Sequence, residues 1–90
     1  MSRGINDIQL ENLLKNILWL RIHFGISKKK MAELLKIGMV SLNKIENGEL
    51  PPKATMDIIF NVHKNFGIKP HLLFVLDFNE INPLSGEENQ

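Results

Sequence analysis

The sequence predicts a small all-α domain of five helices, followed by a short polar tail. Two observations support this prediction. Apolar residues recur at three- and four-residue steps along most of the chain, and glycine and proline divide it into segments of helical length. A chain of 90 residues forms one domain with a single core. Its composition, 43% hydrophobic and 23% charged, is typical of a soluble globular protein.

The first helix is expected to run from about residue 8 to residue 24. Asp7 is a suitable N-cap, and Gly25 can take the left-handed conformation that ends a helix. Apolar residues at helical spacing define its inward face: Leu10, Leu13, Leu14, Ile17, Leu20 and Phe24.

Two short helices are expected next, separated by only about three residues. Ser27 is placed as the N-cap of a helix over residues 28–35. The following helix should run from residue 40 or 41 to residue 46, because Asn47 and Gly48 both tolerate the positive φ of a turn. So short a connection makes the two helices cross steeply, which predicts a helix-turn-helix over residues 27–48. Its small core should contain Met31, Leu35, Ile37, Leu42 and Ile45.

A fourth helix is expected from about residue 53 to residue 65, with Gly67 as its end. Pro70 fits the first turn of a fifth helix that continues to about Leu76. Residues 72–76 could also form a strand by composition, but the start signal at Pro70 favours a helix. The inward face of the fourth helix is predicted to hold Met56, Ile59, Phe60 and either Val62 or His63.

Charge is distributed unevenly along the chain. Residues 1–70 carry all 11 lysines and arginines against six acidic residues, a net charge of +5. Residues 71–90 carry four acidic residues and no basic one, a net charge of −4. A basic body with an acidic tail favours a polyanionic partner for the body, although chance clustering in a short chain explains the pattern equally well.

No group of residues indicates catalysis or a bound cofactor. The three histidines, His23, His63 and His71, are scattered and have no second ligand at metal spacing. The sequence has no cysteine, and its glycines form no phosphate loop. We therefore expect neither an enzyme nor a metal, cofactor or small-molecule site. Without a signal-peptide pattern or a membrane-spanning apolar run, a cytoplasmic protein is expected.

Residues 26–35 read ISKKKMAELL and residues 42–48 read LNKIENG, with Leu20-Arg21 ahead of them and Pro52 behind. This wording resembles the Cro/C1 (Xre) family of phage and bacterial helix-turn-helix repressors. The resemblance runs without a gap from about residue 20 to residue 52, and more loosely to Leu73. It implies a lambda-repressor-like DNA-binding domain over residues 8–76, with an N-terminal arm over residues 1–7 and an acidic tail over residues 77–90.

The resemblance also implies roles for individual residues. Base-edge contacts would come from Met39, Val40, Asn43 and Lys44. Phosphate contacts would come from Lys28, Lys29, Ser41 and Asn47. Arg21 and Glu46 correspond to a structural salt bridge between the first and third helices. Asparagine can read adenine with two hydrogen bonds and lysine can reach guanine, whereas the two apolar side chains touch thymine methyl groups at most.

Three departures from the family pattern affect these roles. Lys36 replaces the turn glycine, so either a non-glycine residue takes an unfavourable conformation or the turn differs. Gly38 replaces the hydroxyl residue that usually caps the third helix, although glycine is tolerated there. The leading base-reading positions are apolar. In addition, Asn47 has an equal alternative as a simple left-handed turn residue.

The resemblance therefore implies a transcriptional regulator, a repressor that binds a pseudo-palindromic operator in double-stranded DNA as a homodimer, with the third helix in the major groove. The dimer surface is expected on the fifth helix and the tail, with Leu72, Phe74, Val75 and Phe78 as candidates. Alternatively, the tail folds back over Trp19 of the same subunit. The alternative function is a protein-interaction module, such as an antitoxin-like or regulatory partner, whose apolar Met39-Val40 surface contacts protein.

Overall fold

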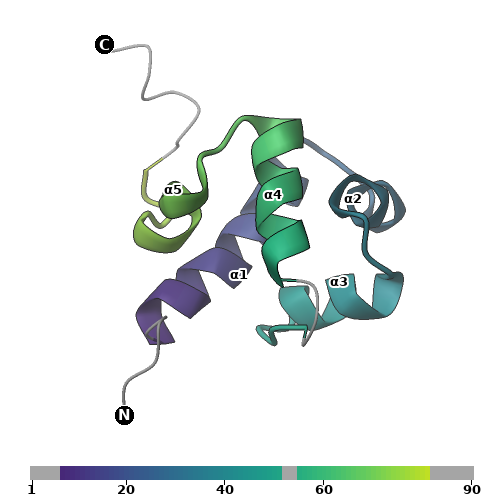
Figure 1. The fold of residues 1–90 in the computed structure, drawn as a ribbon, viewed down its shortest axis with the longest axis horizontal. Coiled ribbons are helices and arrows are strands. Elements are labelled where there is room, and N and C mark those ends of the chain that lie inside the picture. Colours follow the sequence, from purple (N-terminus) through teal and green to yellow (C-terminus); the bar gives the residue numbers. More distant parts are fainter. Residues whose placement is uncertain (1–6, 52–54, 82–90) are drawn as a thin grey trace.

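A computed structural model describes residues 7–51 and 55–81, and within these residues every regular element is a helix (Figure 1). The elements are α1 (Asp7–His23), α2 (Lys28–Leu35), α3 (Met39–Glu46), α4 (Thr55–Phe66) and α5 (Pro70–Val75). The all-α prediction is thus confirmed, and the alternative of a strand near residue 74 is wrong. No helix in the described ranges is long and apolar enough to cross a membrane.

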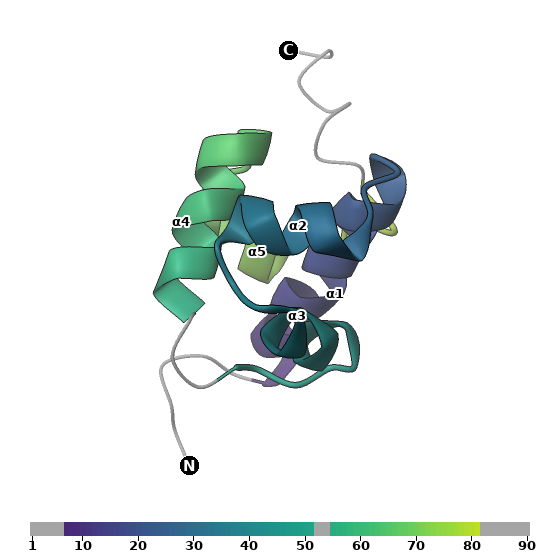
Figure 2. The same ribbon diagram turned by 90° about the vertical axis from the view of Figure 1, so that its right-hand side faces the viewer.

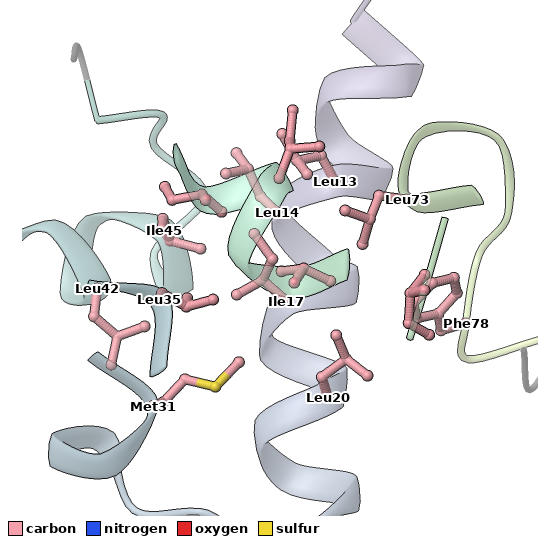
Figure 3. Close-up of a cluster of buried hydrophobic side chains, with 14 of the residues drawn as sticks. Leu13, Leu14, Ile17, Leu20, Met31, Leu35, Leu42, Ile45, Leu73 and Phe78 are labelled. Atoms are coloured by element: carbon pink, nitrogen blue, oxygen red, sulfur yellow. The ribbon is translucent and has the colours of Figure 1, made fainter. Parts of the chain in front are cut away.

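The five helices pack in a ring of neighbouring pairs, beginning with α1. Helix α1 contacts α5 on one side and α3 on the other, while α2 packs against α3 and α4, and α4 also contacts α5. The helices meet around one buried apolar cluster, much of which Figure 3 shows. Its labelled members are Leu13, Leu14, Ile17, Leu20, Met31, Leu35, Leu42, Ile45, Leu73 and Phe78.

Local signals fix most of the helix ends as predicted. The hydroxyl of Ser27 accepts a hydrogen bond from the backbone N–H of Lys30 at 3.1 Å, so α2 begins at the expected cap. Gly25 and Gly67 have φ values of 63° and 72° after α1 and α4, where a left-handed residue ends each helix. Pro70 opens the first turn of α5.

The turn between α2 and α3 keeps its left-handed geometry without a glycine. Lys36 has φ 60° and ψ 45°, and the N–H of Ile37 donates to the carbonyl of Ala32 at 3.0 Å. Gly38 follows in an extended conformation and caps α3 with no side-chain hydrogen bond. As a result α3 begins at Met39, one residue before the earliest predicted start. Two outcomes were possible for this turn, and the structure shows the first: a non-glycine residue, Lys36, takes the unfavourable left-handed conformation.

One expectation for α1 is wrong, and a second is not tested. Phe24 does not continue the buried stripe: it is 47% exposed, and its ring lies 5.5 Å from the ring of Phe66. The physical reason is that α1 ends at His23, so Phe24 falls in the turn and leaves the helical face. The capping role expected for Asp7 depends on a side chain outside the described residues, although the helix does begin at this residue.

The inward face predicted for α4 is right for Ile59 and Val62 and wrong for Met56 and Phe60. Met56 is 76% exposed and Phe60 is 64% exposed, and His63 is exposed as well. The buried side chains are Ile58, Ile59, Val62 and the polar Asn61. The side-chain amide of Asn61 donates to the carbonyl of Leu35 at 3.2 Å, at the open end of α2. The last carbonyls of a helix have no hydrogen-bond partner within that helix. Asn61 therefore faces inward, where it donates to the last carbonyl of α2.

The tail folds back on its own chain as far as it is described. Phe78 is 1% exposed and packs edge-on against Trp19, with ring centroids 5.5 Å apart. The fully buried Asn16 holds this segment: its amide donates to the carbonyls of Leu73 (2.9 Å) and Leu76 (2.8 Å), and its oxygen accepts from the N–H of Phe78 (3.0 Å). The rest of the acidic tail, residues 82–90, and the arm over residues 1–6 lie outside the described residues.

Candidate nucleic-acid interface

Helices α2 and α3 cross steeply, as the short connection predicts. In Figure 2, α2 runs across the view while α3 is seen nearly end-on beneath it. Met31, Ala32 and Leu35 of α2 are buried, as are Leu42 and Ile45 of α3. Since these side chains belong to one core cluster, the two helices form a rigid pair, and the opposite face of α3 is left open to solvent.

The open face of α3 holds the four residues expected to read bases. Val40 is 71% exposed and Met39 is 43% exposed, and Asn43 and Lys44 are also exposed. Positions three and four residues apart share a helical face, so Val40, Asn43, Lys44 and the exposed Asn47 lie side by side. Ser41 lies at the edge of this face and is half-buried. The exposed face of α3 is therefore apolar in its first turn, at Met39 and Val40, and polar in its second turn, at Asn43 and Lys44.

The N-terminus of α2 carries three consecutive exposed lysines, Lys28, Lys29 and Lys30. The first turn of this helix has no acidic residue to balance them. The positive end of a helix favours anions, so cations there are electrostatically unfavourable unless an anion lies nearby.

Lys28 also connects this terminus to the reading face, which the sequence did not indicate. Its ammonium nitrogen lies 3.1 Å from Oδ1 of Asn43 and 3.9 Å from Oε1 of Glu46. These contacts link α2 to α3 at the surface. The buried apolar side chains of the same two helices link them in the core. The signal needed to find this contact is the relative placement of α2 and α3, which spacing along the chain does not give.

Arg21 and Glu46 form a two-pronged ion pair between α1 and the end of α3. Nε of Arg21 lies 2.5 Å from Oε2 of Glu46, and Nη2 lies 3.2 Å from Oε1. Nη1 also donates to the carbonyl of Ile26 at 3.2 Å. The side chains are only 20% and 9% exposed, so solvent screens the pair weakly. The carboxylate of Glu46 therefore lies between two cations, Arg21 and Lys28.

The end of α3 distinguishes the two roles considered for Asn47. Its φ and ψ are −93° and 5°, so it is not the left-handed residue of the turn, and Gly48 with φ 87° takes that conformation. The interpretation of Asn47 as a left-handed turn residue is therefore wrong. Lys44, one turn earlier, has its ammonium 3.9 Å from the exposed carboxylate of Glu49.

The four residues expected at a dimer surface differ in exposure. Val75 is 54% exposed, and Leu72 and Phe74 are half-buried against the core. Phe78 is buried in its own chain and offers no side chain to a partner, so its assignment is corrected.

The tail is fixed further by Asp77, which pairs with Lys15 at 3.3 Å. The N–H of Asn79 donates to the carboxylate of Asp77, and this hydrogen bond holds the pKa of Asp77 below its usual value.

Nothing in the described part of the chain resembles a metal centre: no three histidine or acidic side chains there come close enough to hold an ion. Two shallow cavities of about 180 Å³ each lie along α1. One is lined by Glu11, Leu14, Lys15, Leu18, Ile45, Glu46 and Gly48, and the other by Lys15, Leu18, Trp19, Ile22 and Asn79. Neither contains a group of side chains suited to catalysis.

The chain matches a known protein family. A family model described as helix-turn-helix matches residues 17–73, which is more than half of the chain. The match begins within α1 and ends within α5, so it includes the whole α2–α3 pair and the helices that support it. No curated protein and no solved structure matches the chain significantly.

Proposed function

Because this chain belongs to the Cro/C1-type helix-turn-helix family and is a DNA-binding regulator, we propose that it acts as a repressor that occupies an operator. Helix α3 enters the major groove of double-stranded DNA in this proposal, and its exposed face meets the base edges. The observation that carries the proposal is the juxtaposition of that face with the three consecutive exposed lysines of α2. Contact between Lys28 and Asn43 brings the two features together.

Each group on this surface has a role in the proposal. Lys29 and the N-terminus of α2 bind a phosphate beside the groove, and Ser41 and Asn47 make further backbone contacts. Lys44 reaches guanine, and Met39 and Val40 pack on thymine methyl groups. The ion pair of Arg21 with Glu46 supports this surface, because it links α3 to α1.

We further propose that the regulator binds a pseudo-palindromic operator as a homodimer, because one small reading head contacts few base pairs. The surface proposed for the dimer is the exposed part of α5, around Val75. Val75→Arg should convert dimers to monomers in sedimentation analysis. Phe60→Arg, at another exposed apolar position on α4, is the matched control. If only the control dissociates the dimer, the surface lies on α4 instead.

Selection of bound sequences from random duplex DNA tests the operator directly. The full chain should enrich one motif with two related half-sites, and Lys44→Ala should lose discrimination at one base pair of each half-site. An absence of any enriched motif would overturn the proposal of an operator. Such a result would favour the second candidate, a protein-interaction module, which the exposure of Val40 and Met39 supports.

A further inference from the structure

The contact between Lys28 and Asn43 determines which end of the asparagine amide is free to meet DNA. An ammonium group has only hydrogen-bond donors, so it contacts the carbonyl oxygen of the amide and not its NH2 group. The distance of 3.1 Å from Nζ to Oδ1 is that of a hydrogen bond. The NH2 group of Asn43 therefore remains as the group that the α3 surface presents.

This arrangement changes the base that Asn43 suits. Asparagine reads adenine with both ends of its amide: the oxygen accepts from N6 and the NH2 group donates to N7. The second lone pair of Oδ1 is open, but an adenine amino group approaching it would meet the positive charge of Lys28. Guanine instead presents two adjacent acceptors, O6 and N7, which attract both the NH2 group and the nearby ammonium.

We propose that Lys28 and Asn43 act together as a donor-only reading pair that selects guanine over adenine in the major groove. The inference rests on the proposed function, because it requires α3 to meet base edges. Lys28 thus acts as a specificity-determining residue as well as a source of positive charge. Lys44 is also exposed on this face and has only donors, so the polar turn of α3 favours acceptors throughout.

The neighbouring ion pair explains why Lys28 remains at Asn43 instead of turning to a phosphate. Its ammonium is also 3.9 Å from Oε1 of Glu46, whose carboxylate is held in place by Arg21. The Glu46 side chain is 9% exposed, so water screens its charge weakly and the carboxylate attracts the lysine. A chain of contacts from Arg21 through Glu46 and Lys28 to Asn43 therefore orients the reading amide from the scaffold.

Four forms of the full chain test the proposal by selection from random duplex DNA. Asn43→Ala identifies the base pair that Asn43 reads, as the position where discrimination disappears. Lys28→Met removes the ammonium and keeps a side chain of similar length. Lys30→Met is the matched control: it removes a charge from the same helix end, and the Lys30 ammonium has no hydrogen bond or ion pair in the part of the chain that the structure describes.

The wild-type chain and Lys30→Met should both prefer guanine at the Asn43 position. In Lys28→Met the freed oxygen can accept from adenine, so the ratio of guanine to adenine there should fall by roughly tenfold. Adenine in the wild-type motif, an unchanged ratio in Lys28→Met, or no position altered by Asn43→Ala would overturn the inference and leave the operator proposal intact. If the wild-type chain enriches no motif, the proposed function fails and this inference fails with it.

Discussion

Glu46→Ala should lower the stability of the domain far more than its place near the surface suggests. The change removes both hydrogen bonds that Arg21 donates to Glu46 and leaves the guanidinium with one protein acceptor, the carbonyl of Ile26. It also removes the anion closest to Lys28. Since the Arg21 side chain is only 20% exposed, water replaces the lost partner incompletely.

The expected magnitude lies between two limits. An exposed ion pair contributes up to about 1 kcal/mol, whereas removal of one partner from a fully buried pair costs about 3–5 kcal/mol. With side chains 20% and 9% exposed, the Arg21–Glu46 pair falls between them, at about 2 kcal/mol. In a domain of this size that loss lowers Tm by roughly 8–16 °C.

Thermal denaturation followed by circular dichroism measures the effect, and Glu49→Ala is the matched control. Glu49 also pairs with a lysine, but at 3.9 Å and with a side chain that is 65% exposed, so its loss should cost less than about 0.5 kcal/mol. A double-mutant cycle with Arg21→Ala then isolates the coupling between the two residues. Equal Tm changes for the two glutamate variants, or no coupling in the cycle, would refute the reasoning.

Three further predictions concern the scaffold. Asn16→Leu leaves two carbonyls and one N–H without partners and should cost at least about 3 kcal/mol in urea denaturation, whereas a loss below about 1 kcal/mol would contradict the hydrogen-bonding role. Lys36→Gly removes a side chain from a residue with φ 60° and should stabilise the domain by about 1 kcal/mol; a lower Tm would show that the turn is unstrained. Because the folded pKa of Asp77 is lowered, its stabilising effect is complete above the usual aspartate pKa and is lost as the pH falls through the lowered value. Trp19 fluorescence should report this acid transition of the tail, and Asp77→Asn should lack it; the same transition in both would assign it to another group.

Features of the fold that depend on neighbouring residues could be predicted from the sequence. Ser27, Gly67 and Pro70 determine local backbone conformation and capping, so the ends of α2, α4 and α5 follow from residue type. The full buried face of α4 could not be predicted in this way. Met56 and Phe60 suit burial as well as Ile58 does, and the choice among them depends on contacts with the neighbouring helices.

The DNA-binding surface also combines features that local sequence predicts with features that depend on how the helices pack. The exposed face of α3 and the lysines of α2 follow from helical spacing and from the family resemblance. The hydrogen bond between Lys28 and Asn43 depends on the crossing of two helices, and residues fifteen positions apart give no local sign of it. The packing of the tail over Trp19 could be predicted only as an alternative to a dimer surface, since the burial of Phe78 depends on the polar Asn16 of α1.

Four asparagines have one physical role in common, at the C-terminal ends of α2 and α5. Short helices leave carbonyls without partners at their C-terminal ends. Asn61 and Asn65, one turn apart on α4, donate to the carbonyls of Leu35 and Leu34 at the end of α2. One turn apart on α1, Asn12 and Asn16 similarly donate to the carbonyls at the end of α5, those of Phe74, Leu73 and Leu76.

These amides position the short helices as well as cap them. Each links a carbonyl end to a longer helix at a defined point, whereas apolar contacts alone would let a short helix slide or rotate at low cost. Since Asn61 also donates to the carbonyl of Asp57 on its own helix, its amide has little freedom to follow a displaced α2. The orientation of the DNA-binding helix pair therefore depends on buried polar residues of α4 as much as on the apolar core beneath it.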